Sequence, residues 1–198
     1  TLGPWLNFLE LRKTATEKVR IGLVGKYDLQ DAYKSISESL SHAATYHHHK
    51  VEITFINSEF LTPDNIESQL AVQDGLVICP GFGQRGIEGK ILAVQYARTQ
   101  NMPCFGICLG MQMMVIEFAR NVLGYSDANS SEMDATTPHN VIDMMEDVMK
   151  EVLEAAGVEH EFPLQRMQYA EAMERFGSSG NSGYRVFLYT YGLISVLF

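Results

Sequence analysis

Apolar and polar residues alternate along this chain in segments that predict strands separated by helices. Four apolar runs rich in β-branched residues have the composition of strands buried on both faces, at residues 19–25, 50–56, 74–81 and 102–108. Apolar residues recur at helical spacing in the segments 31–46, 87–100 and 109–124. This alternation predicts an α/β fold: an open, mostly parallel sheet with helices on both faces and right-handed crossovers.

The same pattern divides the chain. Residues 1–18 mix a few large apolar residues with charged ones, so we expect an interdomain linker segment or a short helix packed on the outside. Residues 19–198 are enough for one domain with a sizeable core. The helix expected at 109–124 is apolar on most of its circumference, which predicts that it is buried.

Composition narrows the classes of partner. A formal net charge of −9 repels a phosphate backbone, so we expect no nucleic acid partner. No apolar run reaches the ~20 residues that cross a bilayer, so we expect no membrane insertion. The three cysteines have neither disulfide-framework nor zinc-site spacing, which favours a reduced, cytoplasmic protein without a metal site.

One cysteine lies where a strand is expected to end and a helix to begin. Residues 106–110 read Gly-Ile-Cys-Leu-Gly, the form of a nucleophile elbow, in which small neighbours allow a tight turn that exposes the central side chain. The helix N-terminus would favour a thiolate at Cys108, and the N–H of Leu109 would point at a developing oxyanion. We therefore predict Cys108 as the nucleophile, whereas Cys104, within the strand, is expected to be a core thiol.

A second oxyanion donor is expected from the end of the neighbouring strand. Residues 79–90 contain Gly81 and Gly83, which let a backbone approach a ligand closely. Taken alone, this stretch could equally be a glycine-rich connection that binds nothing. Next to the elbow, the functional interpretation is the better one.

Four stretches of the sequence together resemble one family. They are "GLVGKY" with "DAYKS", "PGFGQRGIEGK", "FGICLGMQMMVIEFARNVLG" and "SDANSSEMD" with "TPHNVIDMM". In this order they are similar to the glutamine amidotransferase (glutaminase) domain of CTP synthases, and the similarity covers residues 19–145. The resemblance implies the class-I glutaminase form of the fold, which is flavodoxin-like.

The resemblance also implies a reaction. Cys108 would attack the side-chain amide of L-glutamine through a thioester and release ammonia. A synthetase domain, absent from this chain, would use ATP and magnesium to convert UTP to CTP with that ammonia. No cofactor is implied for the glutaminase domain itself.

Site residues follow from the matched motifs. Gly81 and Leu109 match oxyanion and substrate-contact positions, and Gly110 and Met111 lie beside them in the elbow. Gln112 and Glu132 match positions that hold the polar groups of glutamine. A carboxylate at Glu132 suits the substrate α-ammonium, although a solvent-facing loop acid is the alternative.

A cysteine glutaminase also needs an acid that protonates the leaving ammonia, normally a histidine oriented by a carboxylate, and this pair is not visible in the sequence. The family carries a His-Pro-Glu triplet, which this sequence lacks. His160 precedes Glu161 directly, but neighbours on a strand face opposite sides, and His139 matches a position without a catalytic role. We therefore expect a domain that lacks its C-terminal end. A regulatory or interaction module of the same fold, or another cysteine hydrolase or redox-responsive α/β protein, are the alternatives.

Overall fold

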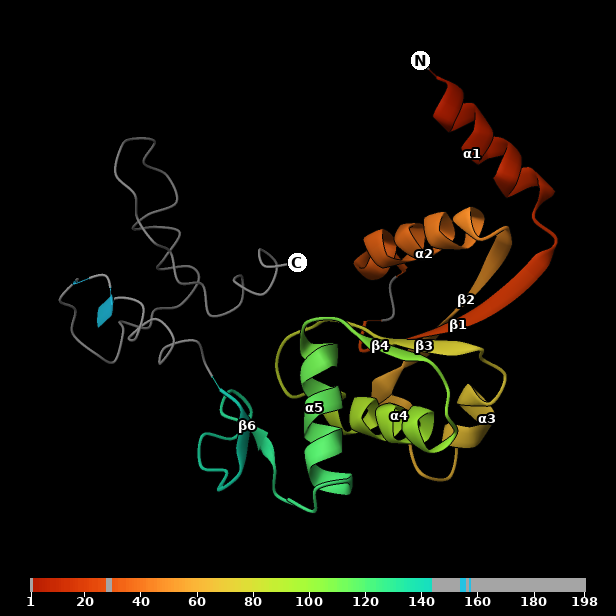
Figure 1. Ribbon diagram of the computed structural model, residues 1–198. Coiled ribbons are helices and arrows are strands. Elements are labelled where there is room, and N and C mark those ends of the chain that lie inside the picture. Colours follow the sequence, from red (N-terminus) through yellow and green to blue (C-terminus); the bar gives the residue numbers. More distant parts are fainter. Residues whose placement is uncertain (1, 28–29, 144–153, 156, 158–198) are drawn as a thin grey trace. The chain divides into compact units, whose positions relative to one another are not determined.

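The computed structural model describes residues 2–27, 30–143, 154–155 and 157, and the chain divides into two units, residues 1–142 and 143–198. Within the second unit, residues 154–155 are helical and residue 157 lies in a turn. The first unit contains the predicted sheet and helices (Figure 1).

The sheet has four parallel strands in the order β2-β1-β3-β4. Their bounds are Glu17–Gly25 for β1, His49–Asn57 for β2, Gly75–Ile78 for β3 and Cys104–Gly106 for β4. In the register of the sheet, Val24 pairs with both Ile56 and Ile78, and Ile78 pairs with Gly106. All four strands therefore end at the same edge of the sheet, and the predicted fold class is confirmed.

Helices cover both faces of this sheet (Figure 1). The helix α2 lies on one face, and α3 and α4 lie on the opposite face. The bounds of the helices are Gly3–Thr14 for α1, Lys34–Tyr46 for α2, Ile66–Leu70 for α3, Ile87–Thr99 for α4 and Leu109–Asn121 for α5. Two short 3-10 turns, η1 (Gln30–Tyr33) and η2 (Ser58–Phe60), and a small parallel pair, β5 (Asn129–Ser130) and β6 (Asn140–Ile142), complete the unit.

Alternating side chains of the strands fill two cores. Leu23 and Val77 pack with Tyr33 and the residues of α2, whereas Val24 and Ile78 pack with residues of α3 and α4. Each fully buried aliphatic side chain contributes roughly 1.5–3 kcal/mol. Successive residues of each apolar run therefore pack on opposite faces of the sheet, as expected for a parallel sheet that helices cover on both sides.

A buried ion pair joins α4 to α5. The carboxylate of Glu117 is 1% exposed and accepts hydrogen bonds from Nε and Nη2 of Arg98, at 2.8 to 3.1 Å. Asn121 Nδ2 also donates to it at 3.1 Å. These donors compensate for the loss of water around a buried carboxylate, so the pair fixes how α5 lies against α4.

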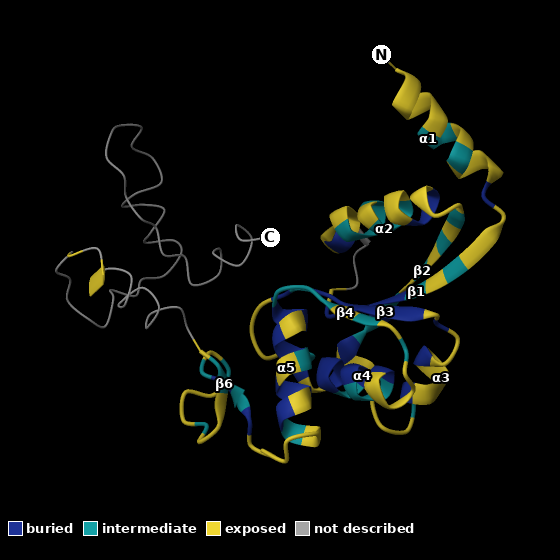
Figure 2. Ribbon diagram, viewed as in Figure 1, coloured by how far each residue is buried: buried dark blue, intermediate teal, exposed yellow. Residues whose placement is uncertain are grey.

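The prediction that the helix after Cys108 is buried is wrong for one of its two faces. One face of α5 packs in a core with α4 through Leu109, Met113 and Ile116. The opposite face is exposed, and it carries Met111, Val115, Phe118 and Val122. Figure 2 shows the two faces as alternating dark blue and yellow bands. The reason is that β4 is the edge strand within the described residues, and its own Phe105 is 65% exposed.

The first helix, α1, has no buried residue and stacks the rings of Trp5 and Phe8. Its role as a linker remains a prediction. Among the residues that the structure describes, no helix combines the length and apolar character needed to cross a membrane.

Candidate active site around Cys108

The chain makes a tight turn at Cys108, between β4 and α5. Cys108 has φ 52° and ψ −114°, a left-handed conformation that a non-glycine residue adopts at a cost of about 1–3 kcal/mol. A Cβ on Gly106 would lie 2.6 Å from the backbone nitrogen of Met111, and one on Gly110 would overlap the carbonyl oxygen of Ile78. Both glycines of the motif are therefore required by space, as a nucleophile elbow predicts.

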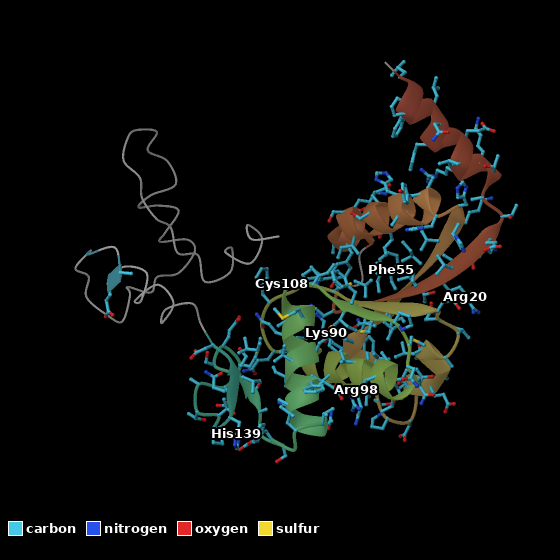
Figure 3. All side chains as sticks on the ribbon, in the orientation of Figure 1. Arg20, Phe55, Lys90, Arg98, Cys108 and His139 are labelled. Atoms are coloured by element: carbon cyan, nitrogen blue, oxygen red, sulfur yellow. The ribbon has the colours of Figure 1, made fainter. Side chains whose placement is uncertain are left out.

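The turn leaves Cys108 partly exposed at the start of α5 (Figure 3). Leu109 is the first residue of the helix, so its N–H has no acceptor within the helix and adds to the positive end of the helix dipole. The other two cysteines differ. Burial raises the pKa of Cys79 to about 12 and that of Cys104 to about 11, so both are neutral thiols.

The glycine-rich loop, residues 79–86, lies directly beside the elbow. The N–H of Ile107 donates to the carbonyl of Ile78 at 3.0 Å, which ties the elbow to the end of β3. A Cβ placed on Gly81 would lie 3.8 Å from Cδ2 of Leu109. The structure therefore brings Gly81 next to the turn that carries Cys108, although its role as an oxyanion donor stays a prediction.

Glu132 belongs to a segment that is fastened to the same loop. Nε2 of Gln84 donates to the carbonyl of Met133 at 2.9 Å, and the N–H of Glu132 donates to Oγ of Ser130 at 3.2 Å. Glu132 is an exposed residue, but neighbouring groups exclude enough water from its carboxyl to raise its pKa, against the opposing effect of the Lys26 ammonium. A carboxylate at this place can accept a ligand ammonium, which is the role the sequence predicts.

Three further predicted residues lie in the first turn of α5. Gln112 is 7% exposed, and its Oε1 has no hydrogen-bond partner among the described residues. A buried amide oxygen without a partner is costly, so a donor from a ligand would suit it. Gly110 uses its N–H to bond the carbonyl of Ile107 at 2.8 Å, and Met111 is 39% exposed. The contacts of these residues with a substrate remain predictions.

Two lysines of the site were missed in the sequence. Lys26 follows β1 directly and Lys90 lies in the first turn of α4, and both are buried among the residues named above. The signal for Lys90 was present: it interrupts the apolar face that Ile87, Ile91 and Val94 form on α4. A charged residue on a buried face indicates either a partner or a function.

None of the histidines in the described part of the chain lies beside the sulfur. Nδ1 of His139 lies 2.6 Å from Oδ1 of Asp127, near the opposite end of α5 from Cys108 (Figure 3). His42 packs its ring against Phe8 of α1. The histidines at positions 47–49 lie at the amino end of β2, across the sheet from the edge that carries the elbow. His160 is outside the described residues, and the described residues contain no cluster of metal ligands.

A parallel α/β sheet with a cysteine at a strand-to-helix turn on its carboxyl edge is the arrangement of proteins that carry a nucleophile elbow. The family model described as Glutamine amidotransferase class-I matches residues 28–177. The chain therefore belongs to the class-I glutamine amidotransferase family.

Within this family, the chain is similar to CTP synthases. The chain is 66% identical over 147 residues to a CTP synthase of Bacteroides fragilis, covering 74% of this chain and 28% of the relative. It is 54% identical over 147 residues to a CTP synthase of Flavobacterium johnsoniae, covering 74% of this chain and 27% of the relative. The solved glutaminase domain of Trypanosoma brucei CTPS with bound acivicin is 41% identical, with a TM-score of 0.61, covering 65% of this chain and 51% of that one. The chain thus spans somewhat over a quarter of the length of these CTP synthases.

Proposed function

We propose that this chain is a glutaminase domain that hydrolyses L-glutamine through a thioester on Cys108. The observation that carries the proposal is the position of Cys108. This residue is partly exposed, has a backbone φ of 52°, and lies at a helix N-terminus beside the loop of Gly81. Family membership supports glutamine as the substrate. Glu132 would accept the substrate ammonium, and the unpartnered Oε1 of Gln112 would accept a donor of the same ligand.

The steps follow from this arrangement. The thiolate of Cys108 forms a bond to the amide carbon of glutamine while the carbonyl electron pair moves to oxygen, where the N–H groups of Gly81 and Leu109 stabilise the charge. When that pair returns, the carbon–nitrogen bond breaks and the nitrogen leaves as ammonia with one added proton. Water then attacks the thioester, which releases glutamate and restores the thiol.

The leaving nitrogen needs an acid, normally a histidine oriented by a carboxylate. Because the described histidines lie elsewhere, we place this acid outside the described residues or on an accompanying part of the protein. If the acid comes from an accompanying part of the protein, the chain hydrolyses glutamine only when that part is present.

The wider function that we propose is that of CTP synthase. The ammonia would pass to a synthetase domain, the expected partner, which would aminate UTP to CTP with ATP and magnesium; the names of the relatives support this assignment. A cytoplasmic location is part of the proposal, since all three cysteines are free thiols.

The direct test uses a chloroketone analogue of glutamine and a Cys108→Ala control. We expect peptide mapping to find the adduct on Cys108, and an assay for ammonia to show release from glutamine that the control lacks. An adduct without ammonia release would favour either a regulatory module of the same fold or an acid that an accompanying part of the protein supplies. Failure of the reagent to label Cys108 would refute the glutaminase assignment.

A further inference from the structure

Two buried lysines bind the glycine-rich loop, one at its first residue and one in its middle, on either side of Gly81. Nζ of Lys90 donates to the carbonyl of Cys79 at 2.7 Å, and Nζ of Lys26 donates to the carbonyl of Gly83 at 3.2 Å. The stem of Lys26 also fills the space beside Gly81, because its Cε lies 3.0 Å from the position that a Cβ on Gly81 would take. Gly81 lies between the two bound carbonyls, and a Cβ placed on it would lie 3.8 Å from Cδ2 of Leu109 in the elbow.

This loop needs such fixing. Gly81 and Gly83 have no Cβ to restrict their backbone angles, so the peptide planes around them can rotate at little steric cost. An oxyanion donor works only if its N–H already points at the oxygen when the charge develops. Hydrogen bonds from charged donors, each worth roughly 1.5–3 kcal/mol, oppose a rotation of the peptides that they hold.

The burial of these cations has no evident structural reason. Lys90 is 0% exposed and Lys26 is 3% exposed, and removing an ammonium from water is costly. Lys90 also lies in the first turn of α4, where the positive end of the helix dipole repels a cation. An apolar residue would continue the face of Ile87 and Ile91, so stability alone would not select a lysine here.

Lys90 lies close to Cys108, and Lys26 lies close to the segment of Glu132. Burial lowers the pKa of Lys90 to about 8, and the other groups that act on it are Cys79, Lys26 and Cys108. Figure 3 shows Lys90 on α4 beside the turn of Cys108. The groups acting on Lys26 include Arg85, Glu59 and Glu132. The two ammonium groups thus connect the loop to the elbow on one side and to the Glu132 segment on the other.

We propose that Lys26 and Lys90 are positioning residues: through the carbonyls of Gly83 and Cys79 they hold the loop so that the N–H of Gly81 faces the carbonyl attacked by Cys108. They act through the loop and do not bond to the substrate. This inference rests on the proposed glutamine hydrolysis and adds the device that makes the oxyanion site rigid.

The test compares two reactions of the same sulfur in the full chain. The γ-aldehyde of glutamate adds reversibly to the thiol: the sulfur–carbon bond forms, the carbonyl electron pair moves to oxygen, and the thiol proton ends on that oxygen. This adduct places its oxygen where the oxyanion would lie. Iodoacetamide alkylates the sulfur by displacing iodide and develops no oxyanion at a carbonyl carbon. Neither reaction requires turnover or the acid that protonates the leaving nitrogen.

The variants are Lys90→Met, Lys26→Met and the surface control Lys50→Met, with circular dichroism as the check of folding. We expect both buried-lysine variants to bind the aldehyde about tenfold more weakly, a part of the ~10²–10³ lost when a direct oxyanion donor is removed. Iodoacetamide rates should fall by less than the aldehyde affinity, because loss of a nearby ammonium affects the thiolate in both reactions, whereas loss of support for the loop affects only the oxygen of the aldehyde adduct. Lys50 is exposed, so its variant should match the wild type. Lys90→Gln and Lys26→Gln, which keep a neutral donor, should recover part of the affinity.

Each other outcome is decisive. Unchanged aldehyde affinity in both Met variants would overturn the proposal, and so would a parallel fall in the alkylation rate, which would place the lysines' effect on the sulfur itself. A variant that fails to fold is replaced by its Gln counterpart at the same position. If the wild type neither binds the aldehyde nor releases ammonia, the glutaminase proposal itself fails, and that result is distinct from the others.

Discussion

Replacing Lys90 by methionine should make the protein more stable. The lysine pKa falls from its ordinary 10.5 to about 8 because burial penalises the ammonium. That difference of about 2.5 corresponds to about 3 kcal/mol of unfolding free energy lost near pH 7. Methionine fills a similar volume without charge, but it gives up the hydrogen bond to Cys79, worth about 1 kcal/mol for a neutral donor. We therefore expect a net gain of about 2 kcal/mol.

The pH dependence gives a sharper version of this prediction. Below pH 8 the lysine is charged in both states and the penalty is complete. Between pH 8 and 10.5 the unfolded chain binds the proton and the native one does not, so the native state gains stability as the pH rises. From pH 7 to pH 9 this gain is about 1 kcal/mol in the wild type. The variant lacks the group, so its advantage should shrink by that amount.

Urea unfolding at pH 7 and pH 9, followed by circular dichroism, measures both quantities. The buried cysteines begin to destabilise the native state near pH 9, where thiols of the unfolded chain ionise, but they do so in both proteins and cancel in the comparison. A wild type and variant with the same pH slope would refute the reasoning, and so would a variant that is less stable at pH 7. Stability that rises while aldehyde affinity falls would separate a functional role of Lys90 from a structural one.

One labelling experiment and two substitutions test the reactivity of Cys108, the space at Gly110 and the ion pair between α4 and α5. Iodoacetamide at pH 8 should label Cys108 ahead of the other two cysteines, whose pKa values burial raises to about 11 and about 12; mass spectrometry of tryptic peptides reads the order. Gly110→Ala would drive a Cβ into the carbonyl oxygen of Ile78, so we expect a loss of several kcal/mol in stability and no labelling by the glutamine chloroketone. Glu117→Ala leaves Arg98 without its buried partner and should cost roughly 2–3 kcal/mol, measured by urea unfolding, because the arginine can still reach water. A cost below about 0.5 kcal/mol would show that the pair does not hold α5 to α4.

The sequence was sufficient for the elements and for the turn that carries Cys108. Strands buried on both faces are continuous apolar runs, and the spacing of two glycines around a cysteine is a local requirement of the turn, so both are visible without coordinates. The structure confirms the parallel sheet and shows why Gly106 and Gly110 have no room for a side chain.

Two features depend on the fold and could not be predicted in this way. The exposed side chains of α5, such as Val115 and Phe118, look in the sequence like core residues, because their exposure depends on which strand is at the edge of the described sheet. Lys26 looks in the sequence like an ordinary charged residue, and Lys90 interrupts an apolar helix face. Neither position reveals what it binds, because the partners are backbone carbonyls, which no side-chain motif records.

The order of the strands is what joins these parts into one site. Because β3 lies between β1 and β4, the loop that follows β3 has the end of β1 on one side and the elbow after β4 on the other. Lys26 therefore reaches the loop from one side, Cys108 faces it from the other, and Lys90 supports it from α4, the helix into which the loop continues. If β1 and β3 were not neighbours, Lys26 could not reach Gly83, so the same topology that buries the strands also places a cation at the loop.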